Sequence, residues 1–123
     1  MEFIKTKGNG PERIEVDMLD PVFPPGDSRT AVAPITISPS GLSCQGELYL
    51  GPSPGTKVVT SGLRAFTSTG AAQSISFPVT MPTTGGVAYR VYLDIYAAGY
   101  LIGSYIATED VVIPSVTVGP ITW

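Results

Sequence analysis

The side chains that could do acid–base chemistry in this chain are carboxylates, because the sequence contains no histidine. Histidine is the commonest general base and the usual partner of serine and cysteine nucleophiles, so a hydrolase built from this sequence would need paired acids. The candidates are Asp17, Asp20, Asp27, Asp94 and the adjacent pair Glu109 and Asp110. Adjacent residues in a strand point to opposite faces, so Glu109 and Asp110 would not form a catalytic pair there. We therefore expect that the protein is not an enzyme.

Metal and cofactor sites also find little support in the residue types. The single cysteine, Cys44, excludes an internal disulfide and any site built from several cysteines. A buried position in a strand is expected for Cys44, because free cysteine is among the most buried residue types. The stretch 51–57 has glycines like those of a phosphate loop, but its prolines remove N–H donors that a phosphate would need. We therefore expect no cofactor.

Calcium is the one ion that the turn residues favour. Asp20, Asp27 and Asp110 lie in or beside expected turns, where carboxylate and carbonyl oxygens are the hard ligands that calcium prefers. The chain has no Asp-x-Asp-x-Asp-Gly loop, however, so we assign no metal site from the sequence. A calcium site at these residues stays open.

The longest alternating segment of the sequence is 87–96. Its inward positions are Val87, Tyr89, Val91, Leu93 and Ile95. Such period-two alternation predicts a central strand. The next three residues, 97–99, predict a hairpin link with Gly99 at its left-handed position. The expected pairs with the return strand are Tyr96 with Tyr100, Asp94 with Ile102, Tyr92 with Ser104 and Arg90 with Ile106.

This register predicts two faces for the hairpin. The inner face holds Leu93, Leu101 and Tyr105. The outer face is aromatic and aliphatic, and its members are Tyr92, Tyr96, Tyr100, Ile102 and Ile106. A contiguous apolar patch marks an interface, but aromatic pairs also stabilise a sheet by themselves, so both interpretations stay open. A shift of one residue at Gly99 would turn Ile102 and Ile106 inward.

Shorter apolar or alternating segments predict further strands. They are 13–19, 30–38, 43–50, 57–60, 63–67 and 74–81. Turns rich in glycine and proline separate them at intervals of about eight to twelve residues, which is typical of a β-sandwich. Pro78 favours an edge strand or a bulge over a central position, because proline donates no backbone N–H. The sequence therefore predicts an all-β, antiparallel sandwich of about seven strands over residues 13–113.

The two ends of the chain lie outside this sandwich. Residues 1–12 are polar and end in a cluster of glycine and proline, which predicts an arm or a loosely attached first strand. The tail 114–123 carries apolar side chains from which an isolated domain gains little, and these are Val116, Val118, Ile121 and Trp123. We expect the tail either to contact other proteins, with Trp123 in the interaction surface, or to add an edge strand.

Length and charge limit the classes of function. The 123 residues fit one domain, and only 14% of them are charged, so part of the surface must be neutral or apolar. With seven basic residues and a net charge of −3, the chain lacks the clustered cations that bind nucleic acid. No run approaches the ~18 apolar residues of a transmembrane helix, and the first residues lack the apolar core of a signal peptide. We expect neither nucleic-acid binding nor membrane insertion.

Three segments, at residues 23–27, 76–82 and 89–94, share a pattern of prolines and alternating apolar residues. Together they resemble the bacterial cell-adhesion-related (CARDB-like) immunoglobulin modules. Ser76-Phe77-Pro78-Val79-Thr80-Met81-Pro82 is similar to their strand that ends at proline. Tyr89-Arg90-Val91-Tyr92-Leu93-Asp94 is similar to the alternating strand that follows. Phe23-Pro24-Pro25-Gly26-Asp27 looks like their Pro-Gly lead into the second strand. The resemblance spans residues 12–113 and implies an immunoglobulin-like sandwich, and similar domains also occur as accessory proteins on bacteriophage capsids and tails.

From these features we expect a non-enzymatic structural or interaction module, most simply a virion decoration or surface-assembly protein. Its partner would be a protein scaffold or further copies of itself in a homo-oligomer. Its location would be a virion or an extracellular surface. The alternative is an adhesion or carbohydrate-binding module in which Tyr92, Tyr96 and Tyr100 stack on sugar rings.

Overall fold

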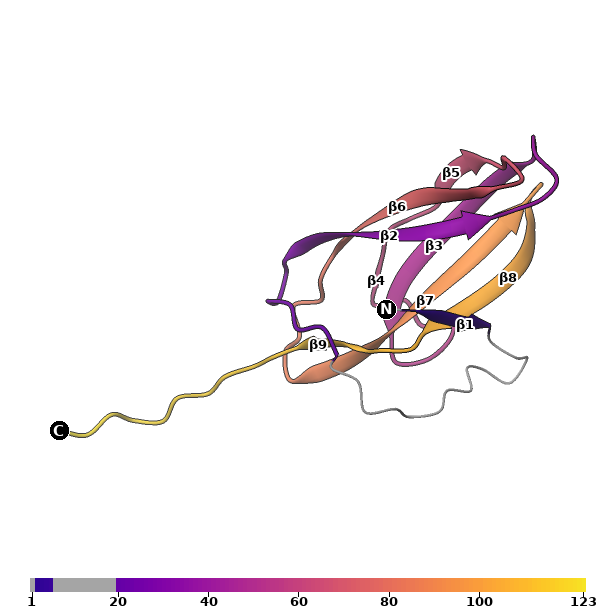
Figure 1. Ribbon diagram of the computed structural model, residues 1–123. Coiled ribbons are helices and arrows are strands. Elements are labelled where there is room, and N and C mark those ends of the chain that lie inside the picture. Colours follow the sequence, from indigo (N-terminus) through magenta and orange to yellow (C-terminus); the bar gives the residue numbers. More distant parts are fainter. Residues whose placement is uncertain (1, 6–19) are drawn as a thin grey trace.

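The computed structural model describes residues 2–5 and 20–123 (Figure 1). Within these ranges the chain forms nine strands and no helix, so the expected all-β fold is confirmed. In particular, the described residues contain no helix long and apolar enough to cross a membrane. The predicted strand at 13–19 and the carboxylate of Asp17 lie outside the described residues.

The strands form a large sheet and a small one. The large sheet contains β1 (Phe3–Lys5), β3 (Ser43–Gly51), β4 (Val59–Thr60), β5 (Arg64–Thr67), β7 (Val87–Ala97), β8 (Tyr100–Ala107) and β9 (Val111–Ile113). Its order is β1-β8-β7-β3-β4, with β5 also on β3 and β9 also on β7. Because β7 pairs with β3 on one side and with β8 and β9 on the other, the predicted central strand is confirmed.

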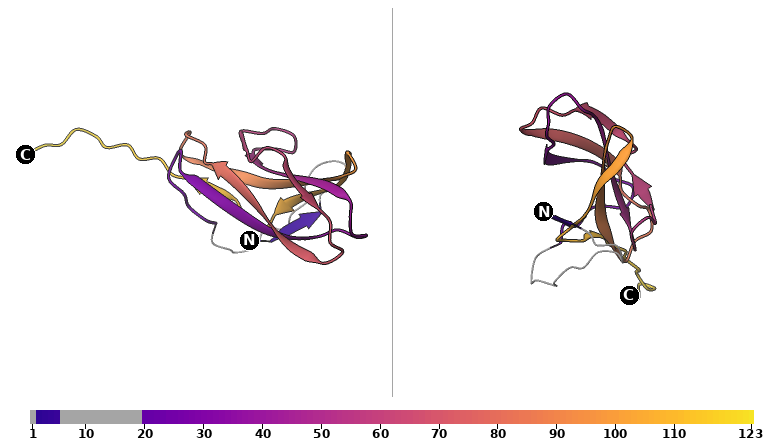
Figure 2. Two further views of the ribbon diagram at one scale, coloured as in Figure 1. Left: turned by 90° about the horizontal axis from the view of Figure 1, so that it is seen from above. Right: turned by 90° about the vertical axis from the view of Figure 1, so that its right-hand side faces the viewer.

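The small sheet consists of β2 (Ser28–Thr36) and β6 (Ala72–Thr80). The two strands pair antiparallel along their whole length, from Ser28 opposite Thr80 to Thr36 opposite Ala72. Figures 1 and 2 show this pair as a separate layer beside the larger sheet. Among the described residues both strands of this sheet are edge strands, which accommodates the prolines of both. Of the two positions predicted for Pro78, an edge strand or a bulge, the structure has the edge strand.

The inner faces of the two sheets form one hydrophobic core. Phe77 of β6 and Leu50 of β3 are among its fully buried side chains, and Cys44 is buried in β3 as predicted. Gly46 of β3 allows the sheets to approach, because a Cβ at this position would lie 3.0 Å from two ring atoms of Phe77. The molecule therefore has the two packed layers of a β-sandwich. An immunoglobulin-like strand order stays a prediction.

The turn predicted between β7 and β8 differs from the observed one. Ala98 and Gly99 alone form it, with φ of 50° and 82°, and a two-residue type I′ turn requires positive φ at both central residues. Ala97 belongs instead to the strand and pairs with Tyr100. The hairpin link thus has two residues and not three.

A bulge in β8 changes the register a second time. Tyr96 pairs with Leu101 but Ile95 pairs with Gly103, so Ile102 has no partner on β7. The pairs beyond the bulge are Asp94 with Ser104, Leu93 with Tyr105 and Tyr92 with Ile106. The pairs predicted for Tyr92, Asp94, Tyr96 and Arg90 are therefore wrong. Leu101, predicted to face inward, is largely exposed.

Candidate interaction site

The outer face of the large sheet carries a row of packed side chains where an exposed patch was predicted. Ile106 of β8 pairs with Tyr92 of β7, and Tyr92 pairs with Tyr49 of β3. The two tyrosine rings stack with their centroids 5.1 Å apart, and Ile4 of β1 packs against the cluster. Tyr92 is 1% exposed and Ile106 0%. Neither side chain belongs to the accessible surface of this chain, which corrects the predicted outer face.

The remaining hairpin residues of the predicted surface are divided between several places. Tyr96 is half-buried, and Tyr100 is exposed at the hairpin tip. Ile102 is 49% exposed and lines a hollow between the two sheets, because the bulge turns it away from the face of Tyr92. The structure therefore does not bring Tyr92, Tyr96 and Tyr100 together as an exposed platform for sugar rings.

The C-terminal tail projects from the domain, as Figure 1 and the left view of Figure 2 show. Residues 114–123 follow β9 and contain no strand. The four apolar side chains that the sequence singled out here, Val116, Val118, Ile121 and Trp123, are each at least 74% exposed. This exposed apolar segment is the first component of the candidate interaction site.

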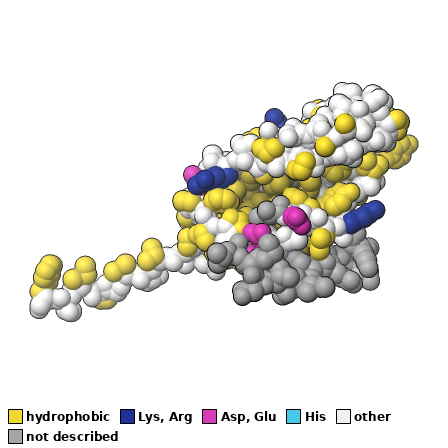
Figure 3. All heavy atoms as spheres, viewed as in Figure 1, with side chains coloured by type: hydrophobic (Ala, Val, Ile, Leu, Met, Phe, Trp, Pro, Cys, Tyr) yellow, Lys and Arg dark blue, Asp and Glu magenta, His cyan; other side chains and the backbone are white. Residues whose placement is uncertain are grey.

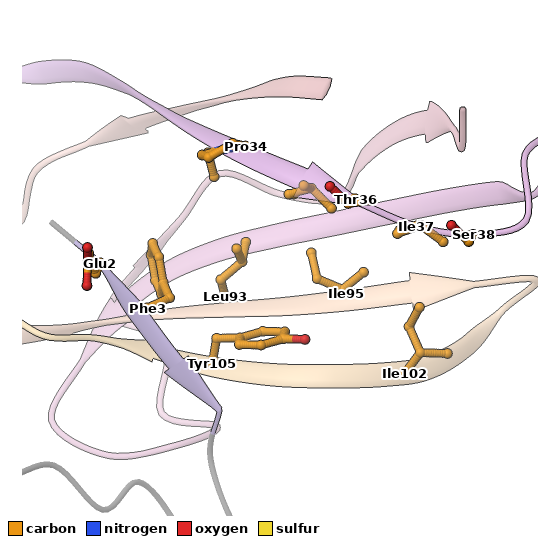
Figure 4. A pocket seen from close by; sticks show the side chains of 12 residues that line it. Glu2, Phe3, Pro34, Thr36, Ile37, Ser38, Leu93, Ile95, Ile102 and Tyr105 are labelled. Atoms are coloured by element: carbon orange, nitrogen blue, oxygen red, sulfur yellow. The ribbon is translucent and has the colours of Figure 1, made fainter. Parts of the chain in front are cut away.

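A groove between the two sheets is the second component. One hollow of about 640 Å³ lies between the C-terminal half of β2 and the inner faces of β7 and β8. Figure 4 shows Phe3, Leu93, Ile95 and Ile102 directed toward β2 across it, with Tyr105 along its floor. A second hollow of about 450 Å³ shares Phe3 and Ala33 with the first and continues along the N-terminal half of β2. Together they form a groove along one side of β2, lined mostly by apolar side chains and visible as the recessed region between the layers in Figure 3.

The strongest polar cluster of the described residues lies on the outer face, at β3 and the loop that follows it. Glu47 is buried in β3, and its two carboxylate oxygens accept hydrogen bonds from Lys57 Nζ at 2.6 Å and from Thr60 Oγ1 at 2.5 Å. The ammonium group of Lys57 also lies 5.2 Å from the ring centroid of Tyr49, and the Tyr49 hydroxyl accepts a hydrogen bond from the Gly55 N–H. The cluster therefore ties the loop 52–58 to the sheet.

The protonation states of Glu47 and Lys57 follow from this contact. Burial alone would raise the pKa of Glu47, but the hydrogen bonds from Lys57 and Thr60 and the positive charge of Lys57 outweigh it, so the pKa lies below its ordinary value of 4.5. The hydrogen bond to Glu47 raises the pKa of Lys57, against the opposing effect of burial. Both groups are held in their charged forms near neutral pH.

The carboxylates considered for catalysis or calcium are mostly engaged elsewhere. Asp20 accepts a hydrogen bond from the backbone N–H of Asp110 at 3.0 Å, whereas Asp27 forms an ion pair with Arg29. Asp94 lies opposite Glu47 on the neighbouring strand, a pairing that was not predicted. No three acidic, histidine or cysteine side chains of residues 2–5 and 20–123 lie together as metal ligands would.

The groove was not predicted from the sequence. The signals available were Pro34 and Pro78, because a proline in each of two paired strands indicates a narrow sheet with free edges.

A search for relatives gives no further guide to the site: no protein-family model, no curated protein and no solved structure matches the chain.

Proposed function

We propose that this protein is a non-enzymatic structural module that assembles with copies of itself on a virion or an extracellular surface. The observation that carries the proposal is the projecting tail, whose four apolar side chains are almost wholly in water in the single chain. Exposed apolar groups cost free energy, at about 25 cal/mol for each Å² that could be buried. Burial of these four side chains against a partner would therefore lower the free energy.

A carbohydrate-binding function draws less support. Stacking on sugars needs exposed rings, and Tyr92 is buried against Tyr49. Tyr100 is exposed at the hairpin tip, but a single ring is a small platform. The virion or surface setting is part of the proposal and draws on the resemblance of segments 23–27, 76–82 and 89–94 to modules that occur there.

The mass of the full chain in solution tests the self-assembly. Light scattering over a wide range of concentration should give a mass that rises above that of one chain. Tyr100→Ser serves as a control, because it removes the exposed ring at the hairpin tip and should leave the association unchanged. A monomeric mass at every concentration would contradict the proposed function.

A further inference from the structure

In the part of the chain that the structure describes, one edge of β2, the edge along the groove, has no strand beside it. Within the described residues β2 pairs with β6 and with no other strand. The hydrogen bond from Met81 N–H to Asp27 O, 2.7 Å, continues the β2–β6 register and directs odd-numbered residues of β2 toward β6. Successive backbone groups of a strand alternate between its two edges. The even-numbered residues Thr30, Val32 and Thr36 therefore direct their N–H and C=O groups to the open edge, together with the C=O of Pro34.

The side chains below this edge form an apolar surface. Ala33, Ile35 and Ile37 of β2 and its end are buried in the core and line the hollow. Leu93 and Ile95 of β7 are directed toward β2 across it (Figure 4). The far wall is β1, a strand of three residues held on β8. A free strand edge above an apolar groove is the geometry that accepts an added strand, because backbone bonds supply affinity and alternate side chains fill the groove.

The tail has the length and the pattern of such a strand. β2 has nine residues and extends about 30 Å at the usual rise of a strand, and the ten residues 114–123 can extend about as far. Val116 and Val118 occupy alternate positions and would share one face, with Ser115 and Thr117 on the other. Gly119 allows a bulge that would bring Ile121 and Trp123 to the face of the valines.

We infer that the segment Pro114–Trp123 of one copy adds as a strand to the open edge of β2 in a second copy, with Val116 and Val118 in the groove. The inference rests on the proposed self-assembly and specifies the contact through which two copies associate. A contact of this kind joins two different surfaces, so it closes as a two-fold dimer when two copies exchange their tails, and it otherwise extends into rings or filaments.

The direction of the tail favours a second copy over the same chain. β9 runs antiparallel to β7 and ends opposite Val87, the first residue of β7, where Gly86 N–H bonds to Ile113 O at 2.7 Å. The tail continues away from the domain from this point (Figure 1). Reaching the β2 of its own chain would require a reversal directly after Pro114, whereas the β2 of another copy needs none.

Charge substitutions in the tail test the groove contact. Val116→Asp combined with Val118→Asp should abolish the rise of mass with concentration, because two carboxylates would enter an apolar groove. The matched control is Ser115→Asp combined with Thr117→Asp, which adds the same charge on the face directed to solvent and should retain association. Equal association of the two variants would overturn the inference. If the wild type itself is monomeric, the proposed function fails as well.

Cross-linking tests which edge receives the tail. All variants carry Cys44→Ala, which removes the only cysteine. Chains with Thr117→Cys are mixed with chains that carry a cysteine on the solvent side of β2, at Thr30, Val32 or Thr36, and treated with a short thiol cross-linker. At least one pair should give a covalent dimer, since facing residues of adjacent strands have Cβ atoms about 5 Å apart.

The control for the cross-link is Ser76→Cys, which lies opposite Val32 on β6 and therefore one strand farther from the open edge. It should give no covalent dimer. Association of the wild type without a cross-link at any β2 position would overturn the inference while the proposed function stands. A cross-link within single chains that carry both cysteines, in dilute solution, would assign the groove to the tail of the same chain and also overturn it.

Discussion

At the scale of single residues, Glu47 is the charged residue that lies buried in the described part of the chain, and its carboxylate has hydrogen-bond donors from the protein. It lies within the large sheet with its side chain 10% exposed, whereas the Lys57 side chain is 36% exposed. A carboxylate with so little water depends on donors from the protein. Lys57 and Thr60 supply them, and this links the loop after β3 to β4.

Because Glu47 is more buried than Lys57, substitutions of the two residues should change the free energy of unfolding by different amounts. Lys57→Ala should lower the free energy of unfolding by about 2 kcal/mol, because it leaves a buried carboxylate without its cation. Glu47→Gln should cost only about 1 kcal/mol, because the freed ammonium group reaches solvent. Urea denaturation of the two variants at neutral pH measures the difference. Equal losses would show that the pair behaves as a surface ion pair.

The same pair predicts how stability depends on pH. The pKa of Glu47 is lower in the folded chain than the ordinary value of 4.5, so its stabilising contribution is fully present above about that pH. The contribution is lost as the pH falls through the lowered pKa. The difference in unfolding free energy between the wild type and Glu47→Gln should therefore shrink from pH 5 downward, about where the unfolded carboxylate begins to bind protons. A difference that stays constant over this range would contradict the assignment.

At the scale of elements, the β7–β8 hairpin decides which side chains are presented on which face. Its two-residue turn and the bulge at Ile102 each shift the register, and a shift of one residue moves a side chain to the opposite face. Ile102 consequently lines the groove, while Ile106 packs on Tyr92. One element thus contributes to both faces of the large sheet.

Two substitutions in the turn of this hairpin should change the stability of the domain in opposite directions. Gly99→Ala should destabilise the domain by about 1 kcal/mol, because only glycine adopts positive φ without a steric cost. Apart from residue 99 itself and its two chain neighbours, the added Cβ would have no atom within 4 Å, so the cost would come from φ alone. Ala98→Asn should stabilise by about 0.5 kcal/mol, because Asn-Gly is the preferred type I′ pair. Thermal unfolding of the two variants against the wild type measures both changes, and equal signs would contradict the assigned turn.

Considered as a whole molecule, the sandwich is asymmetric, because the small layer has two strands among residues 2–5 and 20–123 and the large layer has seven. In the large sheet β7 has partners on both sides, whereas among the same residues β2 has a partner on one side and an open edge above the groove. Natural proteins usually protect an exposed edge with a charge, a proline or a covering segment. Pro34 removes one donor from this edge, and the inferred added strand would satisfy the rest.

Removal of the tail should leave the folded domain intact. A chain that ends at Ser115 keeps β9 and its hydrogen bond to Gly86, and the residues lost are exposed. Its free energy of unfolding in dilute solution should differ from that of the full chain by less than about 0.5 kcal/mol. Dilution matters because association stabilises the folded state by mass action. A large loss of stability in dilute samples would mean that the tail packs on its own domain.

Local patterns of the sequence were sufficient to predict the fold class and most strands. The alternation of 87–96 predicted the central strand β7, and Pro78 predicted either an edge strand or a bulge in place of a central position. Both depend only on neighbouring residues, since side-chain alternation and the missing N–H of proline are properties of the local backbone. The burial of Cys44 was predicted for the same kind of reason, whereas the sequence left open whether the apolar tail adds an edge strand or contacts other proteins.

Only the tertiary structure decided which side chains are accessible. The register of the hairpin depends on a turn and a bulge. Alternative turns and bulges differ little in local free energy, so packing across the sheet selects between them. Tyr92 is buried because Tyr49, more than forty positions earlier, stacks on its ring. The groove, likewise, exists because two sheets of unequal width pack together, a relation between distant segments that no local pattern encodes.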